Sequence, residues 1–126
     1  MRTVRFDDKP EVIQYNNDGT YYYNTDIQQV EVTDEQSEKT TTQWEALQYV
    51  IHNPLTKANI KREVILDHWD KDEQEKFINE YNAAKMGLIA DEEESTKVIE
   101  RYTKFLEYRT SLLAELDNDL KHFNIE

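Results

Sequence analysis

The chain has 126 residues, 33% of them charged, and a net charge of −12. Its length suggests one domain, because a chain of this size builds a single core. The negative charge repels phosphate backbones and anionic membranes, so we expect neither a nucleic-acid partner nor a membrane partner. The absence of cysteine excludes disulfides, thiolate nucleophiles and cysteine-ligated zinc.

The N-terminal residues lack the apolar run that forms the centre of a signal peptide. No apolar run anywhere approaches the roughly 20 residues that span a bilayer. We therefore expect a protein that does not span a membrane and that starts in a cytoplasm.

Residues 1–53 have the pattern of a small antiparallel sheet. Two short runs rich in apolar and aromatic side chains, 12–15 and 20–23, flank Asn16-Asn17-Asp18-Gly19. The Asp-Gly pair tolerates the positive φ angles of a tight hairpin. Residues 3–6 are expected to add a short edge strand.

The side chains then change parity along the strand that follows the hairpin. Tyr21, Tyr23 and Ile27 alternate on one face, whereas Val30 and Val32 belong to the other. A continuous strand therefore needs a bulge or bend between Ile27 and Val30.

The polar stretch 34–42 is predicted to be a mobile loop. The next segment, 44–51, fits two patterns. Trp44, Leu47 and Ile51 fit one face of a helix, whereas Leu47, Tyr49 and Ile51 fit one face of a strand. We predict a strand.

The chain changes character at Asn53-Pro54-Leu55-Thr56, after which three helices are predicted. Asn53 or Thr56 can cap the first helix by accepting hydrogen bonds from its free N–H groups. This helix is expected to end near Trp69.

The second and third helices have clearer boundaries. Asp70-Lys71-Asp72-Glu73 has the spacing of a capping box, and Gly87 with Leu88 is typical of a left-handed helix end with a hydrophobic contact. The third helix is expected to start near Asp91 and to run to about Phe123.

The third helix carries an unbroken alternation of three- and four-residue steps, which is typical of a packing seam. The seam consists of Ile99, Tyr102, Leu106, Arg109, Leu113, Leu116, Leu120 and Phe123. Two interpretations remain open. The seam packs inside the chain on the sheet and the shorter helices, or its distal part, 112–123, pairs with another subunit or protein that offers Arg109 an acidic group.

The sequence lacks motifs for catalysis and cofactor binding. A phosphate-cradling loop needs clustered glycines, and the chain has only Gly19 and Gly87. Residues 67–72 gather carboxylates around one imidazole, but we interpret His68 as a helix C-terminal residue and Asp70 as a cap. We therefore expect a non-enzymatic protein with no catalytic residue, cofactor or metal.

Three consecutive tyrosines cannot all face one side of a strand. If Tyr21 and Tyr23 belong to the core, Tyr22 points the other way, where its large rigid ring suits a binding surface. Ordinary strand propensity is the alternative explanation. The candidate protein-interaction residues are Tyr22, Arg109, Leu113, Leu116, Leu120 and Phe123.

Several segments that span nearly the whole chain carry a resemblance. They are Arg2-Thr3-Val4-Arg5-Phe6-Asp7, Tyr22-Tyr23-Asn24-Thr25-Asp26-Ile27, Asn53-Pro54-Leu55-Thr56, Ile78-Asn79-Glu80-Tyr81-Asn82-Ala83-Ala84 and the segment 102–109. Together they resemble small uncharacterised structural or tail-region proteins of tailed bacteriophages and prophages of gut bacteria. The resemblance implies a virion or tail-assembly role in the virion or host cytoplasm. Its partners would be other phage structural or assembly proteins, or further copies of the chain in a homo-oligomer.

From these patterns we expect one α+β domain over residues 1–126. A small antiparallel N-terminal sheet, a hairpin or meander in 1–53, precedes three C-terminal helices in 54–126, the last one long. An alternative function is an acidic decoy that mimics the charge of DNA and inhibits a host nucleic-acid-binding protein. Against this, lysines and arginines alternate with acids along the long helix, so no stripe of one sign forms.

Overall fold

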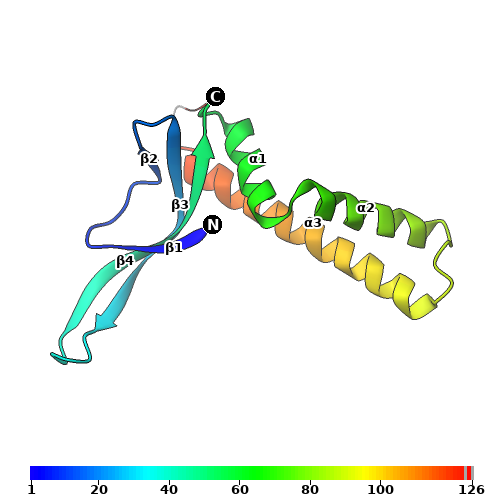
Figure 1. Cartoon of the computed structure of the whole chain (residues 1–126), viewed down its shortest axis with the longest axis horizontal. Helices are drawn as coiled ribbons and strands as arrows, with labels where there is room; N and C mark the ends of the chain where they lie inside the picture. Colours follow the sequence, from blue (N-terminus) through cyan, green and yellow to red (C-terminus); the bar gives the residue numbers. More distant parts are fainter. Residues whose placement is uncertain (124, 126) are drawn as a thin grey trace. The chain divides into compact units, whose positions relative to one another are not determined.

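The computed structural model of the chain describes residues 1–123 and 125. It has a four-stranded antiparallel sheet followed by three helices, the last one long, which confirms the α+β class (Figure 1). The elements are β1 (Arg2–Phe6), β2 (Ile13–Tyr15), β3 (Thr20–Thr33), β4 (Thr40–His52), α1 (Lys57–His68), α2 (Lys71–Lys85) and α3 (Glu92–Leu120).

The sheet has the strand order β1-β4-β3-β2. The hairpin between β2 and β3, the edge position of β1 and the strand over 44–51 are therefore as predicted. Two residues of the hairpin loop have positive φ, Asn17 at 61° and Gly19 at 83°. These angles explain why an Asn- and Gly-containing loop is used at this position.

The register of β3 against β4 shifts between Thr25 and Gln28, so that Asp26 and Ile27 together lie opposite one residue, Ala46. The bulge is thus real, but it starts before Ile27 and not after it. Asp26 has a φ of 51°, which places it in the left-handed region. Beyond the bulge, Val30 returns to the face that Tyr23 and Thr25 share, as the cross-strand pairs show.

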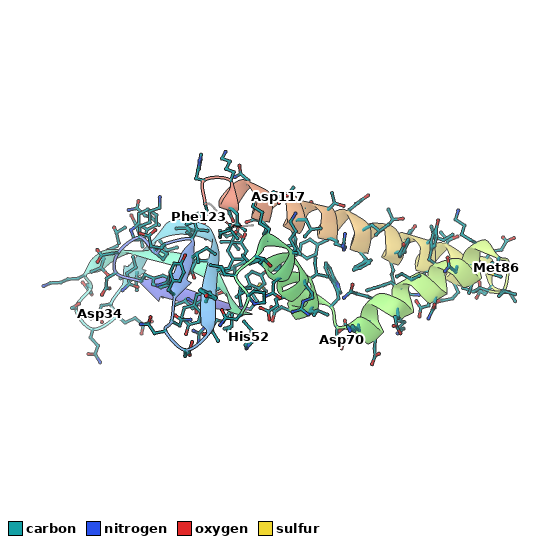
Figure 2. The ribbon with its side chains drawn as sticks, turned by 90° about the horizontal axis from the view of Figure 1, so that it is seen from above. Asp34, His52, Asp70, Met86, Asp117 and Phe123 are labelled. Carbon is teal, nitrogen blue, oxygen red and sulfur yellow. The ribbon has the colours of Figure 1, made fainter. Side chains whose placement is uncertain are left out.

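The loop predicted over 34–42 is shorter than expected. Thr40, Thr41 and Thr42 belong to β4 and pair with Thr33, Val32 and Glu31. Threonine favours strands because its branched side chain suits a pleated surface, and this preference outweighs the polarity of the segment. Strands β3 and β4 therefore remain paired up to the loop that contains Asp34 (Figures 1 and 2).

The chain divides into two compact units. Unit 1 comprises Met1–Val64 together with the chain from Asp119 onward, and unit 2 comprises Ile65–Asn118. Helices α1 and α3 each begin in one unit and end in the other.

The core of unit 1 lies on one face of the sheet. Its buried side chains include Ile13, Tyr23, Tyr49, Ile51, Ile60, Val64 and Leu120. The Tyr23 and Tyr49 rings stack with their centroids 5.7 Å apart. The Asp119 carboxylate accepts hydrogen bonds from the Tyr23 hydroxyl and the Thr25 hydroxyl, each at 2.7 Å.

The opposite face of the sheet holds a buried polar network. Asn24, which is fully buried, donates to the Glu11 carbonyl at 2.8 Å and to the Gln14 side chain at 2.7 Å. It also accepts from Gln48 at 3.1 Å. The segment between β1 and β2 is thereby held against this face, and the buried amides gain partners that offset their loss of water.

Helix α1 is capped by Thr56, whose hydroxyl accepts from the Asn59 backbone N–H at 3.1 Å. The Asn59 amide donates to the carbonyls of His52 at 2.6 Å and Pro54 at 2.9 Å. These bonds fix the connection from β4 to α1, so of the two caps considered from the sequence the structure uses Thr56.

In unit 2, α2 and α3 form an antiparallel hairpin whose tip carries Met86 (Figures 1 and 2). The predicted capping box is present at Asp70 and Glu73. At the other end Gly87 has a φ of 72°, and the Leu88 N–H donates to the Ala83 carbonyl at 2.9 Å. Leu88 is 69% exposed, so it adds little apolar burial to this cap.

Aromatic rings fill the space between the two helices of the hairpin. Phe77 stacks on Phe105 with ring centroids 4.9 Å apart, and Tyr81 stacks on Tyr102 at 4.4 Å. Trp69 meets the Phe105 ring edge-on at 4.8 Å. These contacts set the register of α2 against α3.

Candidate protein-interaction surfaces

Tyr22 lies on the sheet face opposite to that of Tyr23, as its cross-strand pairs with Gln14 and Val50 show. It is half-buried, and the Arg2 guanidinium lies 5.5 Å from the centre of its ring. Val50 beside it is 46% exposed. The predicted orientation of Tyr22 away from the core is therefore correct, and its ring is part of an accessible patch with Arg2 and Val50.

The remaining five candidate residues have unequal exposure. Leu116 and Leu120 are fully buried within the chain. Leu113 and Phe123 are half-buried, and Arg109 is exposed. Contact with another protein through the two buried leucines would require the chain to open. Of these five candidates, Arg109 and Leu113 on α3 and Phe123 after its end are accessible.

The buried face of α3 is rotated slightly from the seam read in the sequence. Val98 is 3% exposed and Phe105 is 7% exposed, although neither belongs to the seam. Leu106, which does belong to it, is 41% exposed. One flank of the helix is thus packed within the chain, whereas the flank that carries Ile99 and Leu106 stays open in part.

The α2–α3 hairpin has one charged side. A shallow pocket of about 140 Å³ is lined by Glu73, Lys76, Phe77, Glu80 and Arg101. The Arg101 guanidinium lies 3.8 Å from the Glu80 carboxylate, and the Lys76 ammonium 3.9 Å from the same group. Because these charges neutralise one another, the pocket presents no concentrated field to a charged ligand.

The opposite side of the hairpin is apolar. Helical spacing places Ile78 next to Tyr81 on α2, and Ile99 and Leu106 next to Tyr102 on α3, away from the charged pocket. We call these five residues the apolar hairpin face. Ile78 is 42% exposed and Leu106 is 41% exposed. No residue of α2 is fully buried, so the hairpin leaves a large share of its apolar surface in water.

His68, at the end of α1, packs against aromatic rings. Its ring centroid lies 5.5 Å from those of Trp69 and Tyr108. Burial lowers the pKa of His68 below the ordinary value, while the Asp67 carboxylate acts in the opposite direction. The side chain therefore serves the packing of the helix end, and its proton is more easily lost than that of a free histidine.

An imidazole–carboxylate pair occurs at the end of β4. The Nδ1 atom of His52 lies 3.1 Å from Glu63 Oε1, and Glu63 Oε2 accepts from the His52 backbone N–H at 2.8 Å. This double contact ties β4 to α1. Within residues 1–123 and 125, no group of three or more His, Asp or Glu side chains has a spacing that could hold a metal ion.

Leu106 belongs to the predicted seam, but neither Leu106 nor Ile78 is among the predicted protein-interaction residues. The spacing of Phe77, Ile78 and Tyr81 indicates one face of a helix. It does not show which of these side chains contact α3 and which remain exposed. That assignment depends on the ring contacts between α2 and α3, which the sequence does not specify.

No protein-family model, curated protein or solved structure matches the chain, so no relative's activity or ligand carries over to it. Among the helices that the structure describes, none combines the length and apolarity needed to cross a membrane.

Proposed function

We propose that the chain is a non-enzymatic structural or assembly protein of a tailed bacteriophage, which acts in the virion, the tail or an assembly intermediate through protein–protein contacts. The observation that carries the proposal is the apolar hairpin face. Exposed isoleucine and leucine side chains around stacked tyrosines are typical of surfaces that contact another protein. They are atypical of a helix that packs only within its own chain.

Two further features support a role in binding. The resemblance of the segments around residues 2–7, 22–27 and 78–84 is to phage structural proteins. In addition, the Tyr22 patch offers a second accessible surface in unit 1, built from an aromatic ring, a guanidinium and an aliphatic side chain. Tyrosine and arginine are the side chains most enriched in interface centres.

The test is the composition of purified phage particles and of the assembly intermediates in cells that produce the phage. Quantitative mass spectrometry is expected to find the chain at a fixed ratio to another structural protein. Cross-linking is expected to join it to that protein through lysines of unit 1 or unit 2, such as Lys9 and Lys85.

The opposing result is that the chain is missing from both particles and intermediates. If, in that case, the tagged chain instead captured a host nucleic-acid-binding protein, and salt or DNA released that protein, the acidic decoy would replace the structural role.

A further inference from the structure

The loop that connects β2 to β3 contains an aspartate followed directly by a glycine, Asp18 and Gly19. Gly87, the other glycine of the chain, follows a methionine, so this pair occurs once. Both residues of the pair are exposed. The side-chain carbon Cγ of an aspartate can be attacked by the backbone nitrogen of the next residue, and a glycine there has no side chain to hinder the approach. The loop is therefore a candidate for a spontaneous modification of the chain.

This modification requires no reagent other than water. The Gly19 nitrogen forms a bond to Asp18 Cγ and gives up its proton, and one oxygen of the carboxyl group leaves as water, so that a cyclic succinimide forms. Water then opens the ring at either of its carbonyl carbons. One opening restores aspartate, and the other gives isoaspartate, in which the main chain runs through the former side chain and is one methylene longer.

Thr20 holds the carboxylate that would be attacked. Its backbone N–H donates to Asp18 Oδ1 at 3.0 Å, and its hydroxyl donates to the same oxygen. The first bond forms the local turn that aspartate makes with the N–H two residues further along. The Thr20 hydroxyl also accepts from the Asn16 side-chain amide at 3.2 Å. Three side chains are thereby linked across the loop.

Both bonds from Thr20 oppose ring closure. In the ring, the Gly19 nitrogen and Asp18 Cβ are eclipsed about the Cα–C bond, a geometry that lies outside the allowed backbone regions of a residue with a side chain. The bond therefore has to rotate, and the rotation moves Thr20 relative to the carboxylate. The hydrogen bonds from the Thr20 hydroxyl and N–H also lower the pKa of Asp18. They favour the ionised carboxylate, from which no oxygen can leave as water.

The backbone after the pair is held as well. The Asn53 N–H donates to the Gly19 carbonyl at 3.1 Å, and a Cβ added to Gly19 would lie 3.1 Å from Asn53 Nδ2. The next residue, Thr20, pairs with His52 of β4. Asn53 belongs to the connection between β4 and α1, so the loop and this connection restrain each other.

We propose that Asp18 and Gly19 form a site of isoaspartate formation and that Thr20 controls its rate. In the folded chain the reaction has to wait for the loop to open, so its rate follows the local opening of the loop and not the unfolding of the whole chain. The longer main chain of the product would disturb the contact with Asn53. The modification is therefore expected to loosen the connection between the loop and α1.

The experiment is a prolonged incubation of the purified full chain at neutral pH, once in buffer and once in guanidinium chloride. Mass spectrometry with electron-transfer fragmentation measures isoaspartate at residue 18, because aspartate and isoaspartate have equal masses but give different fragments. Deamidation of Asn16 or Asn17 changes the mass and is counted separately. The folded chain is expected to react at least about tenfold more slowly than the unfolded chain.

Variants of Thr20 test its control of the rate. Thr20→Val removes the hydroxyl and keeps the shape and the N–H, and it is expected to raise the rate in buffer about threefold to tenfold. Thr20→Ser keeps the hydroxyl and is expected to stay within about twofold of the original rate. Asp119→Ala is the matched control, because it removes two hydrogen bonds elsewhere in unit 1. It is also expected to stay within about twofold of the original rate.

Two results would overturn the proposal. One is an equal rate in buffer and in guanidinium chloride, which would show that the folded loop does not restrain the pair. The other is a Thr20→Val variant that, while circular dichroism shows it folded, reacts no faster than the original chain or than Asp119→Ala. Neither result bears on the composition of phage particles, so this site and the structural role can fail separately.

Discussion

Asp26 has a φ of 51° inside a strand whose other residues are extended. Aspartate tolerates the left-handed region better than most residues, and β-branched residues tolerate it worst. We expect Asp26→Gly to change the free energy of unfolding by less than about 0.5 kcal/mol, since relief of strain is offset by the greater freedom of glycine in the unfolded chain. Asp26→Val is expected to cost about 1–2 kcal/mol.

Urea denaturation of both variants measures these changes. Gln29→Val is the control, because residue 29 is an exposed and regularly paired position of the same strand. If Asp26→Val were as harmless as the control, the bulge would not depend on the conformation of this residue.

His68 gives the chain a dependence on pH. Because burial lowers its pKa in the folded state, the unfolded chain takes up a proton first as the pH falls below the ordinary value of 6.5. The folded state is therefore expected to lose stability from that point downward, until the folded histidine is also protonated. Above pH 6.5 both states are neutral at this position, and its contribution to the pH dependence vanishes.

The measurement is the free energy of unfolding at several pH values for the original chain and for His68→Gln. The variant is expected to show a smaller decline between neutral and mildly acidic pH. The control is His122→Gln, at an exposed position after α3, and it is expected to keep the original decline. Equal slopes in all three proteins would contradict the assignment.

Two glycines with positive φ terminate local elements: Gly19 ends the hairpin loop before β3, and Gly87 follows α2. An added side chain would meet different surroundings at the two positions. Gly87, with a φ of 72°, has open space where a Cβ would lie, whereas a Cβ on Gly19, with a φ of 83°, would lie 3.1 Å from Asn53 Nδ2. Gly87→Ala is expected to cost about 1 kcal/mol, from backbone conformation alone. Gly19→Ala is expected to cost more, since Asn53 must also move. Chemical denaturation of the two variants gives the order directly, and the reverse order would show that the hairpin can relax around the added methyl.

The local elements were largely predictable because their signals are local. The hairpin before β3 and the capping box at Asp70 each depend on a few adjacent residues, and both are present. Within the hairpin loop the positive φ angles fall on Asn17 and Gly19 and not on Asp18. The position of the bulge was harder to predict. The alternation of side chains along β3 shows only that the strand changes register somewhere before Val30. The threonines at 40–42 were misread as loop because the segment is polar, although threonine favours strands and the pairing residues of β3 lie nearby in the sequence.

The surface residues were harder to predict than the elements. The spacing of α3 shows which residues share a seam, but Leu116 and Leu106 belong to the same seam and differ completely in exposure. The exposure of Leu106 depends on which flank of α3 meets the rings of Phe77 and Tyr81. Such orientation is a property of packing between elements, and periodicity within one helix does not contain it.

In the chain as a whole, the two sequence segments of unit 1 are joined by hydrogen bonds between residues that lie far apart in the sequence. Asp119, in the last turn of α3, accepts from Tyr23 and Thr25 of β3. Hydrogen bonds to a charged acceptor each contribute about 1.5–3 kcal/mol when well formed, and partial exposure reduces that value. We expect Asp119→Ala to lower the free energy of unfolding by about 1–3 kcal/mol.

Hydrogen exchange distinguishes this loss from a general one. In the Asp119→Ala variant the amides of β3 and β4 are expected to lose protection, while those of the α2–α3 hairpin keep theirs. Asn118→Ala, at the exposed neighbouring position, is the control and is expected to change neither. A uniform loss of protection through the chain would contradict a role confined to unit 1.

The division of the chain also determines the order in which its parts become complete during synthesis. The ribosome delivers all of 65–118 before it delivers Asp119 and Leu120, which belong to unit 1. The sheet therefore lacks part of its core until these residues are delivered, although its strands leave the ribosome early. We expect unit 1 to complete its fold only after Asp119 and Leu120 have left the ribosome. During that interval the growing chain presents an incompletely covered sheet to the chaperones of the cell.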